Sequence, residues 1–385
     1  LLSRRQRQMC IRDRVISVID IEKCVNDRRK FNSDVWGEVP DIVWEKVFVS
    51  GFPYALPEKV DPYPFVPGDP KERKNRCMEI LNLQAKGLIQ RLRATGIEKV
   101  VVGISGGLDS TLALLVCCIA FDQLGLPRKN IHTITMPGFG TSTKTKGLAD
   151  ELIDHLGTTY KVVDITAACT HHLKDIEHAL DVYDITYENV QARERTQILF
   201  DYANMVNGLV IGTGDLSELA LGWCTYNGDH MSNYAVNVGV PKTLVKYLVD
   251  AYADIYAEDN GTRSTKGILK EIVDLPISPE LLPTDKNGEM AQKTEASIGK
   301  YDLHDFFLYH YLRNGFGKEK ILAIAKIAFP KVTEEEISKT LDIFYHRFRT
   351  QQFKRSCIPD GPKVGSVALS PRGDLRLPSD LMKMY

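Results

Sequence analysis

The stretch V-V-V-G-I-S-G-G-L-D-S-T at Val100–Thr111 decides how this sequence is interpreted. A run of valines ends at Gly103, a loop of small residues follows, and the apolar segment Leu112–Ala120 has the length of a helix. A strand, a tight glycine loop and a helix start direct backbone N–H groups and the positive helix end at an anion. The two glycines let the backbone approach that anion closely. The stretch therefore predicts a phosphate site, with the pyrophosphate of a nucleotide as the favoured ligand.

Two common phosphate-binding motifs do not fit this loop. No Gly-Lys-Ser/Thr follows it, as a Walker loop requires, and the spacing G-x-G-x-x-G is absent. The loop resembles instead the S-G-G-x-D-S signature of PP-loop enzymes, which split ATP into AMP and pyrophosphate. A glycine-rich turn that binds no ligand is the alternative interpretation, but six residues in register favour the phosphate site.

The bulk composition is that of an ordinary globular protein. Of 385 residues, 43% are hydrophobic, and the formal net charge is −1, so nothing favours a nucleic-acid or membrane partner. The eight cysteines form neither a C-x-x-C pair nor a metal-binding pattern, which suits a reducing cytoplasm. No apolar run approaches the length of a membrane span, and no signal-peptide pattern begins the chain. We therefore expect a cytoplasmic protein.

Composition divides the chain into five segments, at residues 1–14, 15–50, 51–70, 71–350 and 351–385. The first is arginine-rich without a helical period, and we interpret it as a non-native or disordered arm. The second begins with a strand pattern at Val15–Ile21 and a basic helix at Glu22–Phe31, like the end of a larger domain. The third is rich in proline and aromatic residues and is expected to be an ordered linker. The fourth holds the main fold, and the fifth is a proline- and glycine-rich tail.

Strand and helix patterns alternate through the main segment. Strands are predicted at 99–104, 131–136, 160–165 and 209–213, and helices at 110–122, 144–156 and 188–207. This alternation predicts an α/β fold with a doubly wound parallel sheet and flanking helices. Ligands of such sheets bind at the carboxyl ends of the strands, where Gly103, Met136 and Thr213 fall. Further helices are predicted at 70–95, 216–221, 242–256, 301–314, 318–328 and 333–348, with a long irregular loop at 222–240.

Three segments together carry a resemblance to one family. They read G-I-S-G-G-L-D-S-T at 103–111, Y-E-N-V-Q-A-R at 187–193 and G-T-G-D-L-S-E-L-A-L-G-W at 212–223, with G-D-H-M-S-N-Y and V-P-K-T behind them. From about residue 15 to the end, the chain resembles NAD synthetase, more narrowly the synthetase domain of the bacterial glutamine-dependent form. The resemblance implies a PP-loop fold of the adenine nucleotide alpha hydrolase type for residues 71–350, with the tail contributing to the site.

The resemblance implies a ligase that uses ATP and Mg²⁺. The family adenylates the nicotinate carboxylate of deamido-NAD, releases pyrophosphate, and lets ammonia displace AMP to leave NAD. The glutamine-dependent form also carries a nitrilase-type amidase with a Glu–Lys–Cys triad, of which residues 15–50 resemble only the last strand and helix. We therefore expect free ammonia as the nitrogen donor for this chain. A homodimer or a higher homo-oligomer is expected, as in the family.

The resemblance also assigns roles to individual residues. The implied ATP-binding residues are Gly103, Ile104, Ser105, Gly106, Gly107, Leu108, Asp109, Ser110, Thr213 and Lys242. The implied deamido-NAD-binding residues are Asn189, Glu218, Trp223, Cys224, Thr225, Tyr226, Asp229 and Lys354. Asp109 and Glu218 are the expected metal ligands, and together with Lys354 they form the expected catalytic set.

These residues also have purely structural interpretations. Asp109 and Asp215 are common helix-capping types, and Glu218 can face the helix dipole from a first turn. Lys242 and Lys354 are of a type that is usually solvated. Two other functions stay open: another PP-loop synthetase, such as GMP or asparagine synthetase, and a nucleotide-binding fragment without catalysis.

Overall fold

A computed structural model of the chain describes residues 20–30, 57, 59–139, 143–257, 264–274 and 298–381. The predicted arm at 1–14 lies outside these residues. So does most of the strand predicted at Val15–Ile21, and Ile21 already belongs to helix α2 (Ile21–Lys30). The division of the chain into five segments therefore stays a prediction.

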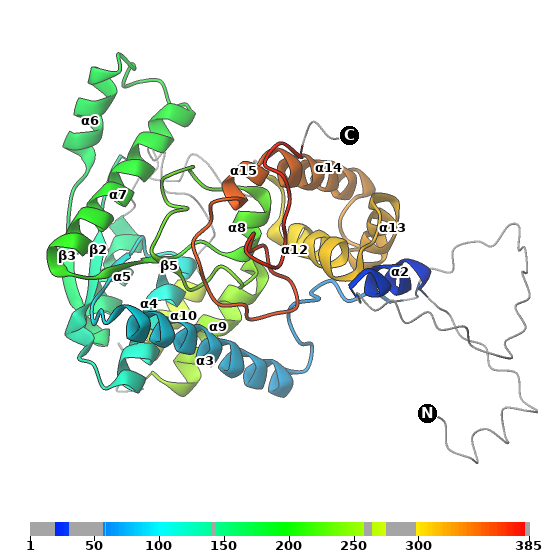
Figure 1. Cartoon of the computed structure of the whole chain (residues 1–385), viewed down its shortest axis with the longest axis horizontal. Coiled ribbons are helices and arrows are strands. Elements are labelled where there is room, and N and C mark those ends of the chain that lie inside the picture. The colour runs from blue at the N-terminus through cyan, green and yellow to red at the C-terminus, as the bar shows by residue number, and fades with distance from the viewer. Residues whose placement is uncertain are drawn as a thin grey trace, which may run out of the picture.

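A parallel sheet of five strands forms the centre of the main segment (Figure 1). Its strands are β1 (Val100–Gly103), β2 (Ile131–Thr135), β3 (Thr159–Val162), β4 (Leu209–Gly212) and β5 (Tyr234–Ala235). The order is β3-β2-β1-β4-β5. The chain therefore adds β2 and β3 on one side of β1, and then β4 and β5 on the other side. Val100 pairs with Ile131 on one side and with Leu209 on the other. The predicted doubly wound fold is confirmed, and β1 lies at its switch point.

Helices cover both faces of the sheet because successive residues of a buried strand point to opposite sides. Val100 and Val102 belong to one apolar core, and Val101 belongs to another. The first core is closed by α3 (Pro70–Thr95), α4 (Leu108–Leu124), α5 (Thr143–Leu156), α9 (Lys242–Ile255) and α10 (Thr265–Val273). The second core is closed by α6 (Thr166–Asp175) and α7 (Ile185–Val206).

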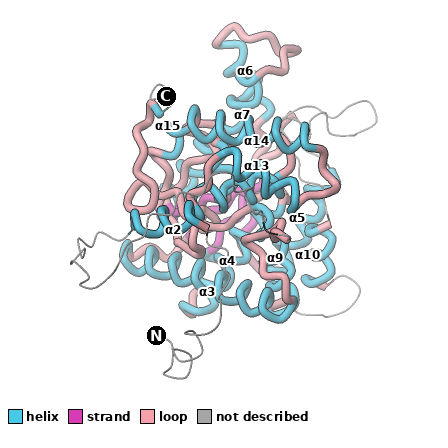
Figure 2. Tube along the Cα trace, turned by 90° about the vertical axis from the view of Figure 1, so that its right-hand side faces the viewer, coloured by secondary structure: helices cyan, strands magenta, loops and turns pink. Residues whose placement is uncertain are grey.

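A second group of helices packs beside the sheet and faces the viewer in Figure 2. It comprises α8 (Leu216–Leu221), α12 (Tyr301–Tyr309), the π-helical turn η2 (His310–Asn314), α13 (Lys318–Ala328), α14 (Glu334–Thr350) and α15 (Gln352–Arg355). Their shared core is largely aromatic and includes Phe306, Phe307 and Phe344. Helix α8 contacts α9 as well as α12 and α14, so it joins this group to the sheet.

Most predicted elements are confirmed to within a few residues, and five described elements were not predicted: α6, α10, α15, β5 and the short 3₁₀ turn η1 (Arg128–Asn130). Helix α6 buries only Cys169 and Leu173 within its length, so its sequence carries little apolar periodicity. Helix α10 begins at Thr265, in a stretch for which no helix was predicted. Strand β5 is two residues long and lies in the predicted loop 222–240. No helix in the described parts of the chain is both long and apolar enough to cross a membrane.

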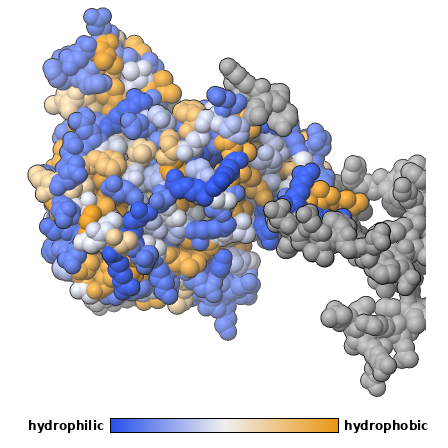
Figure 3. All heavy atoms as spheres, in the orientation of Figure 1, coloured by the Kyte–Doolittle hydropathy of each residue, from blue (hydrophilic) through white to orange (hydrophobic). Residues whose placement is uncertain are grey.

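The turn between α6 and α7 projects from the body of the molecule. Figure 3 shows hydrophobic side chains among hydrophilic ones on this projection. Its exposed apolar residues are Ile176, Leu180, Val182, Tyr183 and Ile185. They lie away from the phosphate loop, at the end of α7 that precedes the predicted substrate contact Asn189.

The tail folds back along the free side of β5. The Ala235 N–H donates to the Asp360 carbonyl oxygen at 2.8 Å, and the Asp360 carboxylate pairs with Arg91 of α3 at 2.8 Å. Arg355 is fully buried and donates to the carbonyl oxygens of Leu219 and Ala220 at the end of α8. The tail is therefore packed against the same strands and helices that carry the predicted site.

We predict that an added methyl group at Gly361 loosens the docked tail. A Cβ there would overlap the Ala235 carbonyl oxygen and a Val238 methyl group, and such overpacking costs about 1–3 kcal/mol. Gly365→Ala is the matched control, because a Cβ at that position meets nothing within 4 Å. Urea denaturation should show a lower free energy of unfolding for Gly361→Ala alone. Equal stability of the two variants would contradict the packing of the tail described above.

Candidate functional site

The predicted phosphate loop connects β1 to α4 and is braced by two serines. Ser110 Oγ lies 3.3 Å from the Ser105 backbone nitrogen and 3.2 Å from Ser105 Oγ. It donates to the Gly107 carbonyl oxygen at 3.1 Å, and the Gly107 N–H donates to Ser105 Oγ at 3.3 Å. Gly106 has a φ of +87°, a conformation that favours glycine. These bonds fix a turn of small residues at the N-terminus of α4, as anion binding requires.

The other predicted ATP-binding residues of this stretch belong to its framework. Gly103 ends β1, Leu108 begins α4, and the N–H of buried Ile104 donates to the Ile134 carbonyl oxygen at 2.9 Å. The N-cap residue of α4 is Gly107, so the interpretation of Asp109 as a helix cap is wrong. Its carboxylate is directed to other partners.

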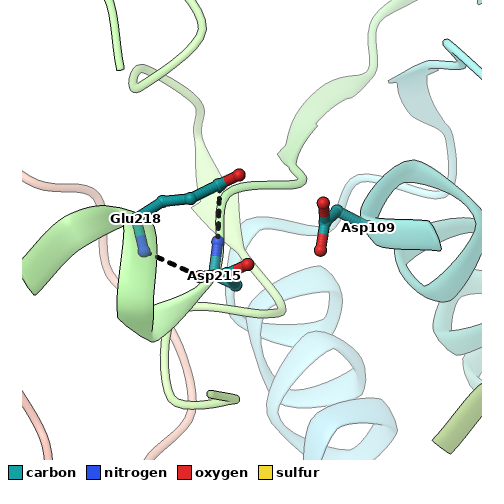
Figure 4. Close-up of side chains that lie close together, drawn as sticks. All are labelled: Asp109, Asp215 and Glu218. Atoms are coloured by element: carbon teal, nitrogen blue, oxygen red, sulfur yellow. Dashed lines mark hydrogen bonds between the residues drawn. The ribbon is translucent and has the colours of Figure 1, made fainter. Parts of the chain in front are cut away.

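Lys242 joins three carboxylates that come from two other helices. Its Nζ lies 2.7 Å from Asp109 Oδ2, 2.6 Å from Asp215 Oδ2 and 2.8 Å from Glu218 Oε1. Figure 4 shows the three carboxylates facing one another, Asp109 from α4 and the other two from α8. One oxygen from each lies within 4.8 Å of the others. We call Asp109, Asp215 and Glu218 the carboxylate trio.

Burial and mutual repulsion set the ionisation of this cluster. Desolvation raises the pKa of Asp215 well above its ordinary value, and the neighbouring Glu218 adds to the rise. Desolvation also raises the pKa of Glu218. Burial alone would lower the pKa of Lys242, but the trio outweighs it, so this pKa is raised. Lys242 is therefore a charged ammonium that is only 3% exposed, and it faces three carboxyl groups, two of which have raised pKa values.

The trio also builds the first turn of α8. Asp215 accepts from the Glu218 N–H at 2.8 Å, and its own N–H donates to Glu218 Oε2 at 3.3 Å, which completes a capping box. The capping interpretation of Asp215 is thus confirmed. The same two side chains still reach Lys242 with their other oxygens. Capping and cation binding are therefore compatible uses of these residues.

A buried asparagine that the sequence analysis did not single out ties the phosphate loop to the end of β4. Asn237 Nδ2 donates to the carbonyl oxygens of Asp109, at 2.9 Å, and Thr213, at 3.1 Å. Gln84 of α3 holds Asn237 in turn, through Nε2 to Oδ1 at 3.0 Å. Both amides are fully buried. Asn237 follows β5 in the predicted irregular loop, where no periodic pattern distinguishes a buried amide.

A second missed residue, Asp305 of α12, holds the starts of α8 and α9 together. Its carboxylate accepts from the Ser217 hydroxyl, from the Thr243 N–H at 2.9 Å and from Thr243 Oγ1 at 2.7 Å. Ser217 Oγ accepts from the Lys242 N–H at 2.8 Å. Asp305 directly precedes the apolar residues Phe306–Leu308, and this is the signal that could have identified it as a buried acid.

The predicted deamido-NAD contacts form a continuous group on the other side of α8. Thr225 Oγ1 donates to Asn189 Oδ1 of α7 at 2.8 Å, and the Thr225 N–H donates to Asp229 Oδ1 at 2.7 Å. Tyr226 is 45% exposed and lies beside Phe353 of the tail, with ring centroids 5.5 Å apart. The structure thus brings residues from three distant segments together. Their roles as substrate contacts stay predictions.

Basic side chains donate hydrogen bonds to the carbonyl oxygens at and just after the end of α8. Lys354 Nζ donates to the carbonyl oxygens of Gly222 and Cys224 at 2.8 and 2.6 Å, and burial lowers its pKa. Arg347 donates to the Leu221 carbonyl oxygen at 2.9 Å, and its guanidinium lies 5.0 Å from the centre of the Trp223 ring. Trp223 therefore packs against α14, while Lys354 is held at the predicted substrate loop.

A narrow pocket of about 20 Å³ joins the two sides of the site. Its walls come from both groups: Gly212, Gly214, Glu218, Leu219, Cys224, Asp229, His230, Ser232, Ala235, Val238 and Pro359. This volume suits about one water molecule. Glu218 of the trio and the predicted substrate loop thus line one pocket at the carboxyl ends of β4 and β5.

The sequence model of the family described as NAD synthase matches residues 80–356. The chain belongs to this NAD synthase family. The matched range contains the phosphate loop, the trio, Lys242 and Lys354. The family assignment therefore covers both sides of the site.

Curated relatives carry the name glutamine-dependent NAD(+) synthetase. The protein of Mycobacterium leprae is 45% identical over 351 residues, which cover 85% of this chain and 51% of that protein. The protein of Aquifex aeolicus is 29% identical over 326 residues, covering 84% of this chain and 51% of that protein. The chain thus spans about half the length of these relatives.

Solved structures of similar proteins show the same fold. A glutamine-dependent NAD(+) synthetase from Cytophaga hutchinsonii superposes with a TM-score of 0.62 at 19% identity, over 79% of this chain and 54% of that chain. NMN synthetase from Francisella tularensis gives a TM-score of 0.53 at 23% identity, over 76% and 98%. The predicted PP-loop type of α/β fold is confirmed.

We predict that Asp305 makes the stability of the fold depend on pH. Desolvation raises the pKa of Asp305 to about 6, although its three hydrogen bonds oppose the rise. Between about pH 4 and 6 the folded state therefore keeps a proton that the unfolded state has lost. Asp305 alone therefore contributes a fall of about 3 kcal/mol in the free energy of unfolding as the pH rises through this range. Buried His304 and His310, whose pKa values burial lowers to about 4, contribute in the opposite direction. Urea denaturation of the unmodified protein and of Asp305→Asn at a series of pH values isolates the Asp305 contribution as the difference between the two curves.

Relative to Asp305→Asn, whose amide does not titrate, the unmodified protein should lose about 3 kcal/mol of stability between about pH 4 and 6. Asp302→Asn is the control on the same helix, and Asp302 accepts from the Tyr63 hydroxyl at 3.3 Å. That variant should keep most of the pH dependence of the unmodified protein, because the Asp302 charge is the smallest cause of the raised Asp305 pKa. An unchanged pH dependence in Asp305→Asn would show that the buried carboxylate is not the group responsible.

Proposed function

We propose that this chain forms NAD by ATP-dependent amidation of deamido-NAD, through an NAD-adenylate intermediate and with release of AMP and pyrophosphate. One observation carries the proposal. In a member of the NAD synthase family, a pyrophosphate-type loop, a carboxylate trio and a substrate loop meet at the same edge of the sheet. Adenylation requires just such proximity of a carboxylate and the α-phosphate.

The phosphate side of the reaction is assigned to the loop and the trio. The ATP phosphates bind the backbone of 103–110, with Thr213 at the neighbouring strand end. Asp109 and Glu218 hold Mg²⁺, which neutralises charge on the transferring phosphate when it is bound. The residues fit this ion: Asp109 Oδ1 is buried without a hydrogen-bond partner, and carboxylate oxygens are the donors that Mg²⁺ prefers. Lys242 contributes positive charge to the phosphates.

The acid side of the reaction is assigned to α7, the loop after α8, and α15. Asn189, Thr225 and Asp229, already bonded to one another, offer polar atoms to the dinucleotide. Trp223, Cys224 and Tyr226 complete this set. The Lys354 ammonium donates to two carbonyl oxygens of the loop after α8 and so positions this loop. In the proposed reaction it also lies beside the nicotinate carboxylate, where negative charge develops.

We propose free ammonia as the nitrogen donor for this chain. Glutamine hydrolysis by a cysteine requires a thiolate. Burial raises the pKa of the thiol in five of the eight cysteines and keeps these thiols protonated: Cys77, Cys117, Cys118, Cys169 and Cys224. Assembly as a homodimer or a higher homo-oligomer belongs to the same proposal.

The direct test is an assay of ATP, deamido-NAD, Mg²⁺ and ammonium chloride. We expect NAD, AMP and pyrophosphate in equal amounts, by chromatography and a coupled pyrophosphate assay. Replacing ammonium with glutamine should give no NAD. Absence of NAD at high ammonium would refute the activity, and NAD from glutamine would refute the proposed donor. AMP formation with xanthylate or aspartate in place of deamido-NAD would favour another PP-loop synthetase.

We predict that Asp109→Asn lowers pyrophosphate release by about a hundredfold or more, because it removes a metal ligand and its charge. Asp122→Asn is the matched control on the same helix, since Asp122 forms a half-exposed pair with Arg128, 2.6 Å away. This control should stay within twofold of the unmodified protein. Circular dichroism should show both variants folded. Near-normal turnover of a folded Asp109→Asn protein would refute the metal assignment.

A further inference from the structure

The ammonium of Lys242 occupies the centre of the carboxylate trio. It contacts one oxygen of each carboxylate at 2.6–2.8 Å and lies 5.3 Å from the centre of the Tyr301 ring. The backbone of Lys242 is fixed separately, because its N–H donates to Ser217 Oγ at 2.8 Å. The start of α9 is therefore anchored, whereas the ammonium is carried by a four-carbon stem that can redirect it.

A divalent cation and this ammonium compete for the same oxygens. The three oxygens lie within 4.8 Å of one another, and an ion bound to two of them at about 2.1 Å would share the space with Nζ. Like charges repel strongly at such separations inside a protein. One ligand position stays open next to the ammonium, because Asp109 Oδ1 is buried and has no hydrogen-bond partner. The arrangement thus accepts one cation at the centre at a time.

We propose that Lys242 is an internal counter-ion that holds the place of the divalent cation in the free protein, and moves to the ATP phosphates when metal and nucleotide enter together. This inference rests on the proposed function of the same site. It explains why a residue matched to phosphate binding contacts carboxylates in the structure. It also makes the carboxylate of Asp215, which was not among the predicted metal ligands, part of the cation site. In the free protein, metal binding without nucleotide is weak.

The test measures Mn²⁺ binding to the whole chain without nucleotide, by electron paramagnetic resonance of the free ion and by calorimetry. Lys242→Met removes the ammonium and keeps a side chain of similar length. We expect it to bind Mn²⁺ at least tenfold more tightly than the unmodified protein, at one site. Mn²⁺ should also raise its melting temperature more than that of the unmodified protein. Equal or weaker Mn²⁺ binding by a folded Lys242→Met protein would overturn the proposal.

Two further variants keep the test decisive. Lys246→Met is the matched control one turn along α9, where the lysine lies over the Tyr247 ring, 5.0 Å from its centre, and should leave Mn²⁺ binding unchanged. Lys242→Arg keeps the charge and should bind Mn²⁺ as weakly as the unmodified protein. If Lys242→Met does not fold, Lys242→Gln replaces it in the same measurement. Tight Mn²⁺ binding by Lys242→Arg or by the unmodified protein also overturns the proposal. These readouts need no turnover, so a failure to form NAD leaves the inference about Lys242 intact.

Discussion

The structure depends on the ion contacts between Lys242 and the carboxylate trio. Three acids so close together in a partly buried site would repel one another and lose hydration, and a single ammonium offsets both costs. The contacts also join three helices that the chain reaches far apart: α4, α8 and α9. Because α4 follows β1 and α8 follows β4, the ammonium links the two strand ends that flank the switch point of the sheet.

Helix α8 relates the two sides of the site, although it has only six residues. Its first turn supplies Asp215 and Glu218 to the cation cluster. Its last carbonyl oxygens accept hydrogen bonds from basic side chains of α14 and α15, among them Arg347 and Arg355. Anionic groups at the N-terminus and cationic groups at the C-terminus both stabilise a helix dipole. Helix α8 therefore joins the cation cluster at its first turn to the basic side chains of α14 and α15 at its end.

The sequence was sufficient for the sheet and for the phosphate loop, because both depend on local patterns. Alternate valines of β1 enter opposite cores, and small residues at 105–107 form the turn. It was not sufficient for Asn237 or Asp305, whose partners lie 128 and 88 residues away along the chain. Lys242 shows the same limit. Its match to a motif indicated a functional residue, but its buried contacts depend on three helices meeting, which no local pattern encodes.

An electrostatic conflict remains at the centre of the site. The turn at the start of α4 attracts a phosphate through backbone N–H groups, yet Asp109, in the first turn of the same helix, belongs to a cluster of three carboxyl groups around one ammonium. A polyphosphate alone would be attracted by the loop and repelled by the cluster. Divalent cations remove the repulsion, and a lysine released from the trio adds attraction. The arrangement of charge therefore favours a nucleotide that arrives with its metal over either one alone.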